Sequence, residues 1–302
     1  ALLAGKHVYV EKPLVLEENE GLELIRIARE KALTLMVGHL LQYHPIFAHL
    51  KDLVQAGELG RINYIYSNRL NLGKIRREEN ILWSFAPHDI SMILTLAGET
   101  PEAVSATGGN YLHQKIADVT TTHLRFPSGL RAHIFVSWLH PFKEQKLVVV
   151  GDKKMAVFDD TLPWQDKLLL YPHEINWQGN MPVPTKKEAE HVSVPEAEPL
   201  RLECEAFLNC IRNGHSPVTD GQEGLRVLRV LNAAQSSMDQ SGREIRFEGY
   251  QGNAIPSSLT AKETKHLSDI YFKHPSVEID DKVSIGEGTN IWHFSHILKN
   301  SK

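Results

Sequence analysis

The sequence predicts an α/β segment of nucleotide-binding type, then an α+β domain on a large, mainly antiparallel open sheet, and finally the start of a triangular β-helix. Three observations predict this order. Helical and strand-like patterns alternate over residues 1–58, consecutive strand-like runs follow over 59–248, and isoleucine recurs every sixth residue within 274–302. Strand–helix alternation is typical of a parallel sheet covered by helices, and consecutive strands separated by turns are typical of an antiparallel sheet.

The first segment is expected to be only part of a nucleotide-binding domain. No Gly-x-Gly-x-x-Gly loop precedes its first strand, although such a domain needs one to hold a pyrophosphate. We therefore expect that the chain starts after that loop, and that this piece alone binds a dinucleotide poorly and is inactive. Its expected elements are a helix end closed by Gly5, a strand at 7–11, a helix at 17–31, a strand at 34–37 and a helix at 45–56.

The second segment changes to short alternating runs. Pro127-Ser128-Gly129 and Gly151-Asp152-Lys153 supply turns between them. One helix, at 88–97, interrupts the series, and the polar, proline-containing stretch 172–198 is expected to be a long surface loop. The expected strands are 61–72, 103–111, 118–126, 130–138, 146–150 and 155–159, and two helices follow at 199–213 and 219–241.

The last part begins with a linker at 249–273, rich in Gly, Pro and Ser. A hexad follows it. One apolar residue per hexad fits a face of a triangular β-helix, whose coils bury that residue only against neighbouring coils. About one coil is present, so we expect the chain to be cut here as well. The hexad positions are Ile279, Ile285, Ile291 and Ile297.

Composition excludes several classes of protein. The 302 residues are 42% hydrophobic and 23% charged, with a net charge of −4 and no Lys/Arg patch, so we expect no nucleic-acid partner. No apolar stretch is long enough to span a bilayer, so we expect no membrane partner. Cys204 and Cys210 fall in one predicted helix and are interpreted as two buried thiols in a reducing cytoplasm. Neither they nor the scattered histidines have zinc spacing, so no metal site is expected.

Glu11-Lys12-Pro13 ends the first strand and is the first candidate for chemistry. In open α/β sheets, ligands bind at the C-terminal ends of the strands. A partly desolvated lysine there has a lowered pKa, which suits proton transfer. On these residues alone, the alternative of a solvated lysine before a helix stays open.

Further polar residues follow other predicted strands. His88, in Pro87-His88-Asp89, suits acid–base work near neutral pH, although a capping or core histidine is the alternative. Arg69 and Asn71 are two apart and are expected to share a strand face toward the substrate. The remaining candidates are His39, Tyr43 and His44 after the second strand and Arg76 and Arg77 in a loop, with ordinary packing and a solvated loop as the alternatives.

Together, these residues resemble the Gfo/Idh/MocA family of oxidoreductases over about residues 1–248. The resemblance implies a Rossmann domain, an open-sheet substrate domain and a nicotinamide cofactor, NAD with NADP not excluded. It implies catalytic roles for Lys12 and His88. The family often carries an aspartate four residues before that histidine, where this chain has Ser84. The implied cofactor-binding residues are Glu11, Lys12, Pro13 and His39, and the implied substrate-binding residues are Arg69, Asn71, Arg76 and Asp89.

The runs Arg69–Gly73 and Ile81–Ser91 resemble the branch that acts on nucleotide-linked sugars. This implies oxidation of a secondary hydroxyl, at C3 of UDP-GlcNAc uronic acid, in the synthesis of cell-surface polysaccharide sugars. The tail resembles the start of a left-handed β-helix N-acetyltransferase, which implies a fused enzyme whose β-helix favours a trimer. The open sheet implies a homo-oligomer. The alternatives are an inositol or polyol dehydrogenase and a non-catalytic assembly module.

Overall fold

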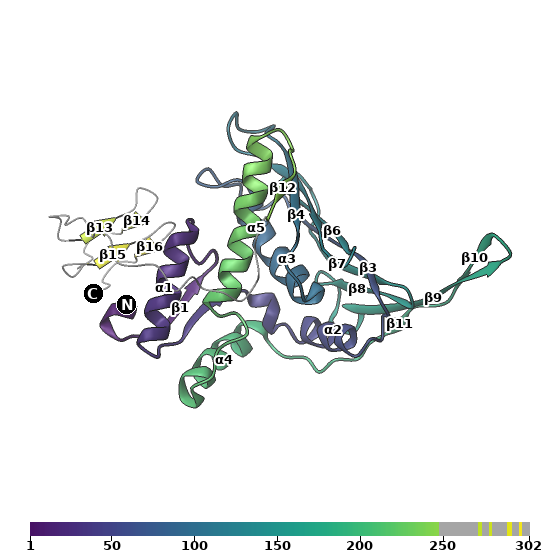
Figure 1. Cartoon of the computed structure of the whole chain (residues 1–302), viewed down its shortest axis with the longest axis horizontal. Helices are drawn as coiled ribbons and strands as arrows, with labels where there is room; N and C mark the ends of the chain where they lie inside the picture. Colours follow the sequence, from purple (N-terminus) through teal and green to yellow (C-terminus); the bar gives the residue numbers. More distant parts are fainter. Residues whose placement is uncertain (248–270, 274–277, 280–288, 292–295, 298–302) are drawn as a thin grey trace. The chain divides into compact units, whose positions relative to one another are not determined.

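The computed structural model describes residues 1–247 and four short strands beyond them: β13 (Tyr271–Lys273), β14 (Glu278–Ile279), β15 (Thr289–Ile291) and β16 (His296–Ile297) (Figure 1). The chain divides into two compact units, 1–250 and 251–302. We describe each unit by itself. No helix in the described residues is both long and apolar enough to cross a bilayer.

A small parallel sheet lies near the N-terminus. β1 (Val8–Glu11) pairs in parallel with β2 (Leu35–Gly38), and α1 (Glu18–Glu30) connects them. The helix buries one apolar stripe and leaves its charged face to solvent, as a crossover helix does. This agrees with the expected strand–helix alternation. The flanking elements are η1 (Leu2–Ala4), closed by Gly5 at φ 72°, then η2 (Leu40–Tyr43) and α2 (Pro45–Gln55).

A ten-stranded sheet dominates the first unit. Its order is β10-β9-β8-β7-β3-β6-β5-β4-β12, with β11 paired to β9. All its ladders are antiparallel except β3 with β6, so the sheet is mixed but mainly antiparallel. The strands are β3 (Ile62–Leu70), β4 (Ala103–Gly109), β5 (Val119–Arg125), β6 (Arg131–Ser137), β7 (Glu144–Gly151), β8 (Lys154–Asp159), β9 (Leu168–Gln178), β10 (Met181–Lys186), β11 (Glu190–His191) and β12 (Ile245–Arg246), with η3 (Trp164–Asp166) before β9.

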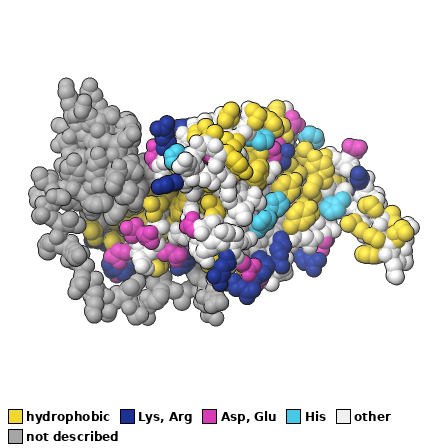
Figure 2. Space-filling view, turned by 90° about the horizontal axis from the view of Figure 1, so that it is seen from above, with side chains coloured by type: hydrophobic (Ala, Val, Ile, Leu, Met, Phe, Trp, Pro, Cys, Tyr) yellow, Lys and Arg dark blue, Asp and Glu magenta, His cyan; other side chains and the backbone are white. Residues whose placement is uncertain are grey.

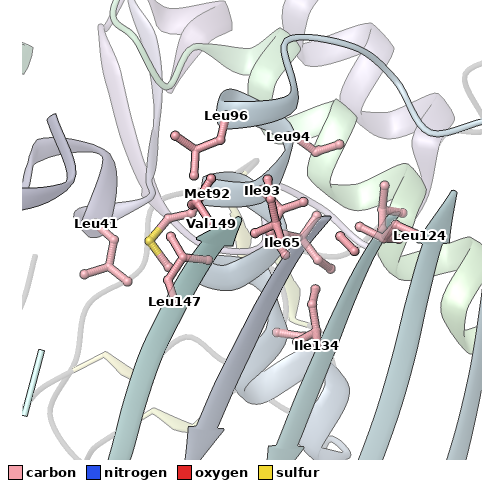
Figure 3. Packing of buried hydrophobic residues seen from close by; sticks show 14 of the residues in the cluster. Leu41, Ile65, Met92, Ile93, Leu94, Leu96, Leu124, Ile134, Leu147 and Val149 are labelled. Carbon is pink, nitrogen blue, oxygen red and sulfur yellow. The ribbon is translucent and has the colours of Figure 1, made fainter. Parts of the chain in front are cut away.

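Three helices cover one face of this sheet, α3, α5 and, on β8, α2, and the described residues of the first unit leave the other face open. α3 (Ile81–Ala97) packs on β3, β5 and β6, and α5 (Gly221–Asp239) packs on β4. Figure 3 shows the core between α3 and the strands, where Ile65, Ile134 and Val149 point toward Ile93. These residues alternate with outward-facing ones along each strand, so the hydrophobic effect sets which face is covered.

α5 also reaches the small sheet, so one helix packs against both sheets (Figure 1). It approaches β2 closely at Gly224, where an added Cβ would lie 2.7 Å from Val37 Cγ2. α4 (Pro199–Asn213) packs against η2. The two sheets are therefore joined inside one compact unit, which brings the C-terminal ends of β1 and β2 toward α3.

The structure corrects three expectations about this unit. α3 begins at Ile81 instead of residue 88, because the Asn80 side chain caps it by accepting from the Trp83 backbone N–H, and Pro87 lies inside the helix. Residues 172–198 contain a β9–β10 hairpin instead of a loop. Its Pro182 and Pro184 lie on the outermost strand, where alternate N–H groups need no partner. Cys204 is exposed on α4, whereas Cys210 is buried as expected.

The second unit is described only at its four strands. β13 pairs in parallel with β15 and β14 with β16. Tyr271 lies opposite Thr289 and Glu278 opposite His296, a spacing of three hexads in each case. Residues 271–273, predicted as the end of the linker, form β13 instead. The rest of the predicted linker and most of the predicted β-helix lie outside the described residues.

Candidate active site

Lys12 follows directly after β1 and reaches α3. Its Nζ donates a hydrogen bond to the backbone carbonyl of Ser84, at 2.7 Å. Burial is the main cause that lowers the pKa of Lys12; Glu79 opposes this and Arg76 adds to it. A lysine with a lowered pKa, bound to a neutral acceptor, is poised to exchange a proton.

Lys12 binds a carbonyl of the second turn of α3. Pro87 lies inside this helix and has no N–H, so the carbonyl of Trp83, four residues earlier, lacks its usual helical donor. The neighbouring carbonyl, that of Ser84, accepts from Lys12. His88 lies four residues after Ser84 and therefore on the same side of the helix. The Lys12–Ser84 contact thus brings the lysine to the side of the helix that carries His88.

His88 is held neutral at this place. Its Nδ1 is buried and has no hydrogen-bond partner among the described residues. The pKa of His88 lies well below its usual value, first because of burial and then because of the positive charges of Arg69 and Lys12. A neutral imidazole offers one N–H donor and one acceptor nitrogen.

His39 comes from the neighbouring strand. Glu11 lies opposite Gly38 in the β1–β2 ladder, so Lys12 and His39 leave the two strands side by side. His39 is 2% exposed, and within the described part of the chain neither of its ring nitrogens has a hydrogen-bond partner. Burial lowers its pKa to about 4, with a further contribution from Lys12.

Arg69 and Asp89 bind each other. The Arg69 Nε donates to Asp89 Oδ2 at 2.8 Å, and its Nη2 donates to Oδ1 at 3.2 Å. Ser67 Oγ also donates to Asp89 Oδ1, at 2.5 Å. Both oxygens of this 1% exposed carboxylate therefore accept hydrogen bonds within the protein. Asp89 thus has a structural role that fixes β3 to α3 beside His88, and its contact with substrate stays a prediction.

The loop between β3 and α3 carries a second ion pair, in which Arg76 Nε lies 3.1 Å from Glu79 Oε1. The Glu79 side chain is 9% exposed, whereas that of Arg76 is 40% exposed. Asn71 directly follows the last residue of β3, and its N–H donates to the Ser137 carbonyl; its predicted contact with substrate stays a prediction. Ser67, two residues before Arg69 on β3, shares its face and its partner Asp89.

A family model described as the GFO/IDH/MocA C-terminal domain matches residues 47–157. The chain is also 30% identical, over 76% of its length and 70% of the relative's, to UDP-N-acetylglucosamine 3-dehydrogenase of Acidithiobacillus ferrooxidans. The chain belongs to the Gfo/Idh/MocA family. A solved structure of that dehydrogenase has a TM-score of 0.69 at 26% identity, covering 80% of this chain and 74% of the other.

Other family members extend the range of relatives. The chain is 25% identical to scyllo-inositol 2-dehydrogenase (NAD⁺) of Bacillus subtilis, over 81% of this chain and 71% of the relative. A solved structure of a putative oxidoreductase from Magnetospirillum magnetotacticum MS-1 is 30% identical, with a TM-score of 0.66 and coverage of 78% and 74%.

Lys12, His39 and His88 lie together in the structure, whereas other predicted site residues contact different parts of the protein. Tyr43 Oη lies 3.0 Å from Thr219 Oγ1. His44 caps α2 and lies near Asp160. Sequence reasoning missed Ser67, Glu79 and the Ser84 carbonyl as partners of the site. Alternation along β3 pointed to Ser67, but no sequence signal marks a backbone carbonyl.

A cavity of about 590 Å³ lies elsewhere, on the open face of the large sheet. His123 and His133, which line it, alternate with the core residues Leu124 and Ile134 and so face away from α3. None of the predicted site residues lines it. Among the described residues, no three His, Cys, Asp or Glu side chains are placed to hold a metal ion.

Proposed function

We propose that this protein oxidises a secondary hydroxyl of a nucleotide-linked sugar with a nicotinamide cofactor. The observation that carries the proposal is the contact of Lys12 Nζ with the Ser84 carbonyl, one turn before His88. It places a desolvated lysine and a neutral histidine together at the C-terminal end of a parallel strand, where open α/β sheets bind ligands.

The directions of the pKa shifts of Lys12 and His88 indicate which residue is the base and which is the hydrogen-bond donor. A base must be neutral to accept the hydroxyl proton, and burial favours neutral Lys12. His88 has a pKa well below its usual value, so it is a weak base but a competent N–H donor. Lys12 is therefore the base, and His88 donates a hydrogen bond to the substrate oxygen. Replacing His88 by Asn tests the second role.

The residues at this place fit the reacting end of a nicotinamide cofactor. Buried nitrogens of His39 and His88 have no hydrogen-bond partner among the residues that the structure describes, and a polar ligand would supply one. Glu11, Lys12, Pro13 and His39 would border it. A bound nicotinamide ring supplies the acceptor for the hydride that leaves the carbinol carbon. NAD is the proposed form, with NADP as the alternative.

The proposed substrate position is C3 of UDP-GlcNAc uronic acid, which would make this protein a UDP-N-acetylglucosaminuronate 3-dehydrogenase. The similarity to an enzyme that acts on UDP-N-acetylglucosamine supports a UDP-sugar. Arg76, whose side chain is 40% exposed, is the proposed ligand for an anionic group of the substrate. The similarity to an inositol dehydrogenase favours a free polyol as the second candidate.

The test is nicotinamide reduction by the purified full-length protein. UDP-GlcNAc uronic acid, UDP-GlcNAc and myo-inositol would be compared with NAD and NADP. Reduction with the uronic acid alone is the expected result. Reduction only with myo-inositol would replace the nucleotide sugar by a polyol. No reduction by a protein that binds the cofactor would favour a non-catalytic assembly module.

The second unit is proposed to begin a left-handed β-helix N-acetyltransferase, fused to the dehydrogenase for the synthesis of cell-surface polysaccharides such as lipopolysaccharide. The hexad spacing and the three-hexad offset of the β13–β15 and β14–β16 pairs support this. Acetyl transfer from acetyl-CoA to a UDP-3-amino sugar by the full-length protein, together with a trimeric mass, is the expected result. A full-length protein that does neither would refute the fusion.

The open face of the large sheet is proposed to join copies of this chain. Val157 and Leu169 lie opposite each other on this face, and alternation continues the face along β9 to Ile175 and Trp177, which are 59% and 68% exposed. Figure 2 shows hydrophobic side chains on the projecting hairpin and over the neighbouring sheet. Val157→Glu should dissociate the oligomer in analytical ultracentrifugation, whereas Leu208→Glu on α4 should not. Equal masses for both variants would locate the interface elsewhere.

A further inference from the structure

Gln235 of α5 holds the start of α3 from outside that helix. Its side-chain Oε1 accepts two hydrogen bonds, from Asn80 Nδ2 at 2.8 Å and from Trp83 Nε1 at 3.1 Å. The two donors precede Gln235 by 155 and 152 positions, so only the packing of α5 against α3 brings them to one oxygen. This single amide oxygen therefore ties both the cap and the first turn of α3 to α5.

Asn80 starts α3 with two oxygens. Its backbone carbonyl accepts from the Ser84 N–H at 3.1 Å, and its side-chain Oδ1 accepts from the Trp83 N–H at 3.3 Å. A capping amide works only when its oxygen points to the helix, whereas its nitrogen can only donate. The bond from Asn80 Nδ2 to Gln235 holds the amide in the capping orientation.

Trp83 lies where α3 is weakened. Pro87 has no N–H to donate to the Trp83 carbonyl, so this turn lacks one of its usual helical bonds. The Trp83 side chain is the one that donates to Gln235. An anchor from another helix thus acts at the turn that the proline loosens.

The anchored turn also holds Lys12. The Ser84 carbonyl directly follows Trp83 in the chain, and it accepts from Lys12 Nζ at 2.7 Å. A displacement of this turn moves the acceptor, and the lysine with it. Displacement of a reacting group by about 1 Å can reduce a rate by about 10²-fold. The position of the turn therefore matters for any proton transfer by Lys12.

We infer that Gln235 is a positioning residue: it fixes the start of α3, and thereby the Ser84 carbonyl that orients Lys12. The inference rests on the proposed function and adds a residue that acts through α3. The side chains of Asn80, Trp83 and Gln235 are half-buried, where hydrogen bonds are stronger than in water.

The protonation of Lys12 should report the loss of this anchor. Gln235→Leu keeps a side chain of similar size but removes the acceptor, so the Ser84 carbonyl is free to move away. A hydrogen-bond acceptor favours the charged ammonium, whereas burial disfavours it. The pKa of Lys12 should therefore be lower in Gln235→Leu than in the native protein. Gln235→Glu keeps the accepting oxygen and should not lower it.

The experiment is an NMR titration of the full-length protein with carbon-13-labelled lysine, in which Lys12→Ala identifies the Lys12 signal. It needs neither cofactor nor substrate, so its result is independent of the proposed reaction. A lower pKa of Lys12 in Gln235→Leu, together with a pKa no lower than native in Gln235→Glu, supports the inference. An unchanged or higher pKa in Gln235→Leu overturns it.

Two further variants separate positioning from general damage to α5. Asp239→Ala is the matched control, because it removes the bond from Gln235 Nε2 and leaves both bonds to α3. It should keep the native pKa of Lys12, and a pKa as low as in Gln235→Leu would overturn the inference. Trp83→Phe removes the indole N–H but keeps an aromatic ring. It should lower the pKa of Lys12, and it decides the question if Gln235→Leu does not fold.

The second measurement is turnover with the substrate found in the assay above. Gln235→Leu should lower kcat at least about tenfold and change KM less, because the lysine is misplaced for proton transfer while the substrate contacts remain. Gln235→Glu should restore most of kcat. An unchanged kcat in a folded Gln235→Leu variant would refute the positioning role even if the proposed reaction is correct. If no substrate is found, the titration decides the inference and only the proposed function fails.

Discussion

Lys12 Nζ and the carbonyl oxygen of Ser84 lie 2.7 Å apart, although 72 positions separate the residues in the chain. The contact ties the end of β1 to the second turn of α3. It holds the lysine through a neutral backbone acceptor. A carboxylate partner would favour the charged ammonium. The carbonyl leaves burial as the dominant influence on the pKa of Lys12.

Replacing Lys12 by Ala should lower kcat/KM by about 10²–10⁴-fold, because the variant lacks the proposed base. The fold should persist, since the side chain makes a single hydrogen bond to α3. Steady-state kinetics and circular dichroism measure the two effects. Lys6→Ala is the matched control, because Lys6 is an exposed lysine just before β1. Near-normal activity of the Lys12 variant would remove it from the mechanism.

The pH dependence of kcat/KM in a Glu79 variant should show whether Lys12 is the group whose deprotonation controls the rate. Neutral lysine is the active form, so the rate rises with pH through the pKa of Lys12. The negative charge of Glu79 raises that pKa, and Glu79→Gln should therefore move the rising limb to lower pH. Glu78→Gln, a substitution at the exposed residue next to Glu79, should not change the pH at which the rate rises. A limb that stays fixed in both variants would mean that another group controls the rate.

Asp89→Asn should destabilise the protein by about 3–5 kcal/mol. It leaves the buried guanidinium of Arg69 without its counter-charge, and a buried ion is costly when its partner is removed. Urea unfolding measures the change. Glu102→Gln breaks a more exposed pair with Arg125 and should cost less than about 1 kcal/mol. Similar values for the two variants would contradict a structural role for the Arg69–Asp89 pair.

Ionisation of the Glu203 carboxyl group should lower the free energy of unfolding as pH rises. This residue of α4 is 1% exposed, and burial raises its pKa, although the hydrogen bond from Tyr9 opposes this. A carboxyl group whose folded pKa is above its unfolded pKa contributes most stability in acid, and this contribution is lost at higher pH.

Glu203→Gln should therefore be more stable than the native protein at neutral pH and differ little from it near pH 4. Urea midpoints at the two pH values measure this. Glu205→Gln, on an exposed part of the same helix, should show no such dependence. A Glu203 variant that is less stable at neutral pH would show that the ionised carboxylate is required.

The order of elements up to residue 58 follows from the sequence, because hydrophobic periodicity and caps act over a few residues. The start of α3 was missed for the same reason. Pro87 is a strong local signal for a helix start, yet the Asn80 cap and the packing of Ile81 and Leu82 in the core extend the helix through it. The β9–β10 hairpin was missed because prolines on an outermost strand resemble those of a loop.

The sequence by itself determined the alternating first segment, the mainly antiparallel sheet, and Lys12 and His88 as the candidate pair. Residue type and spacing are sufficient for these, since they depend on neighbours in the chain. Only the tertiary structure decided that Asp89 binds Arg69 and that Lys12 binds the Ser84 carbonyl. It also decided that, among the described residues, His44 has hydrogen-bond partners and His39 has none. These outcomes depend on which distant groups are brought together in a buried space, where each polar atom must find a partner or remain without one.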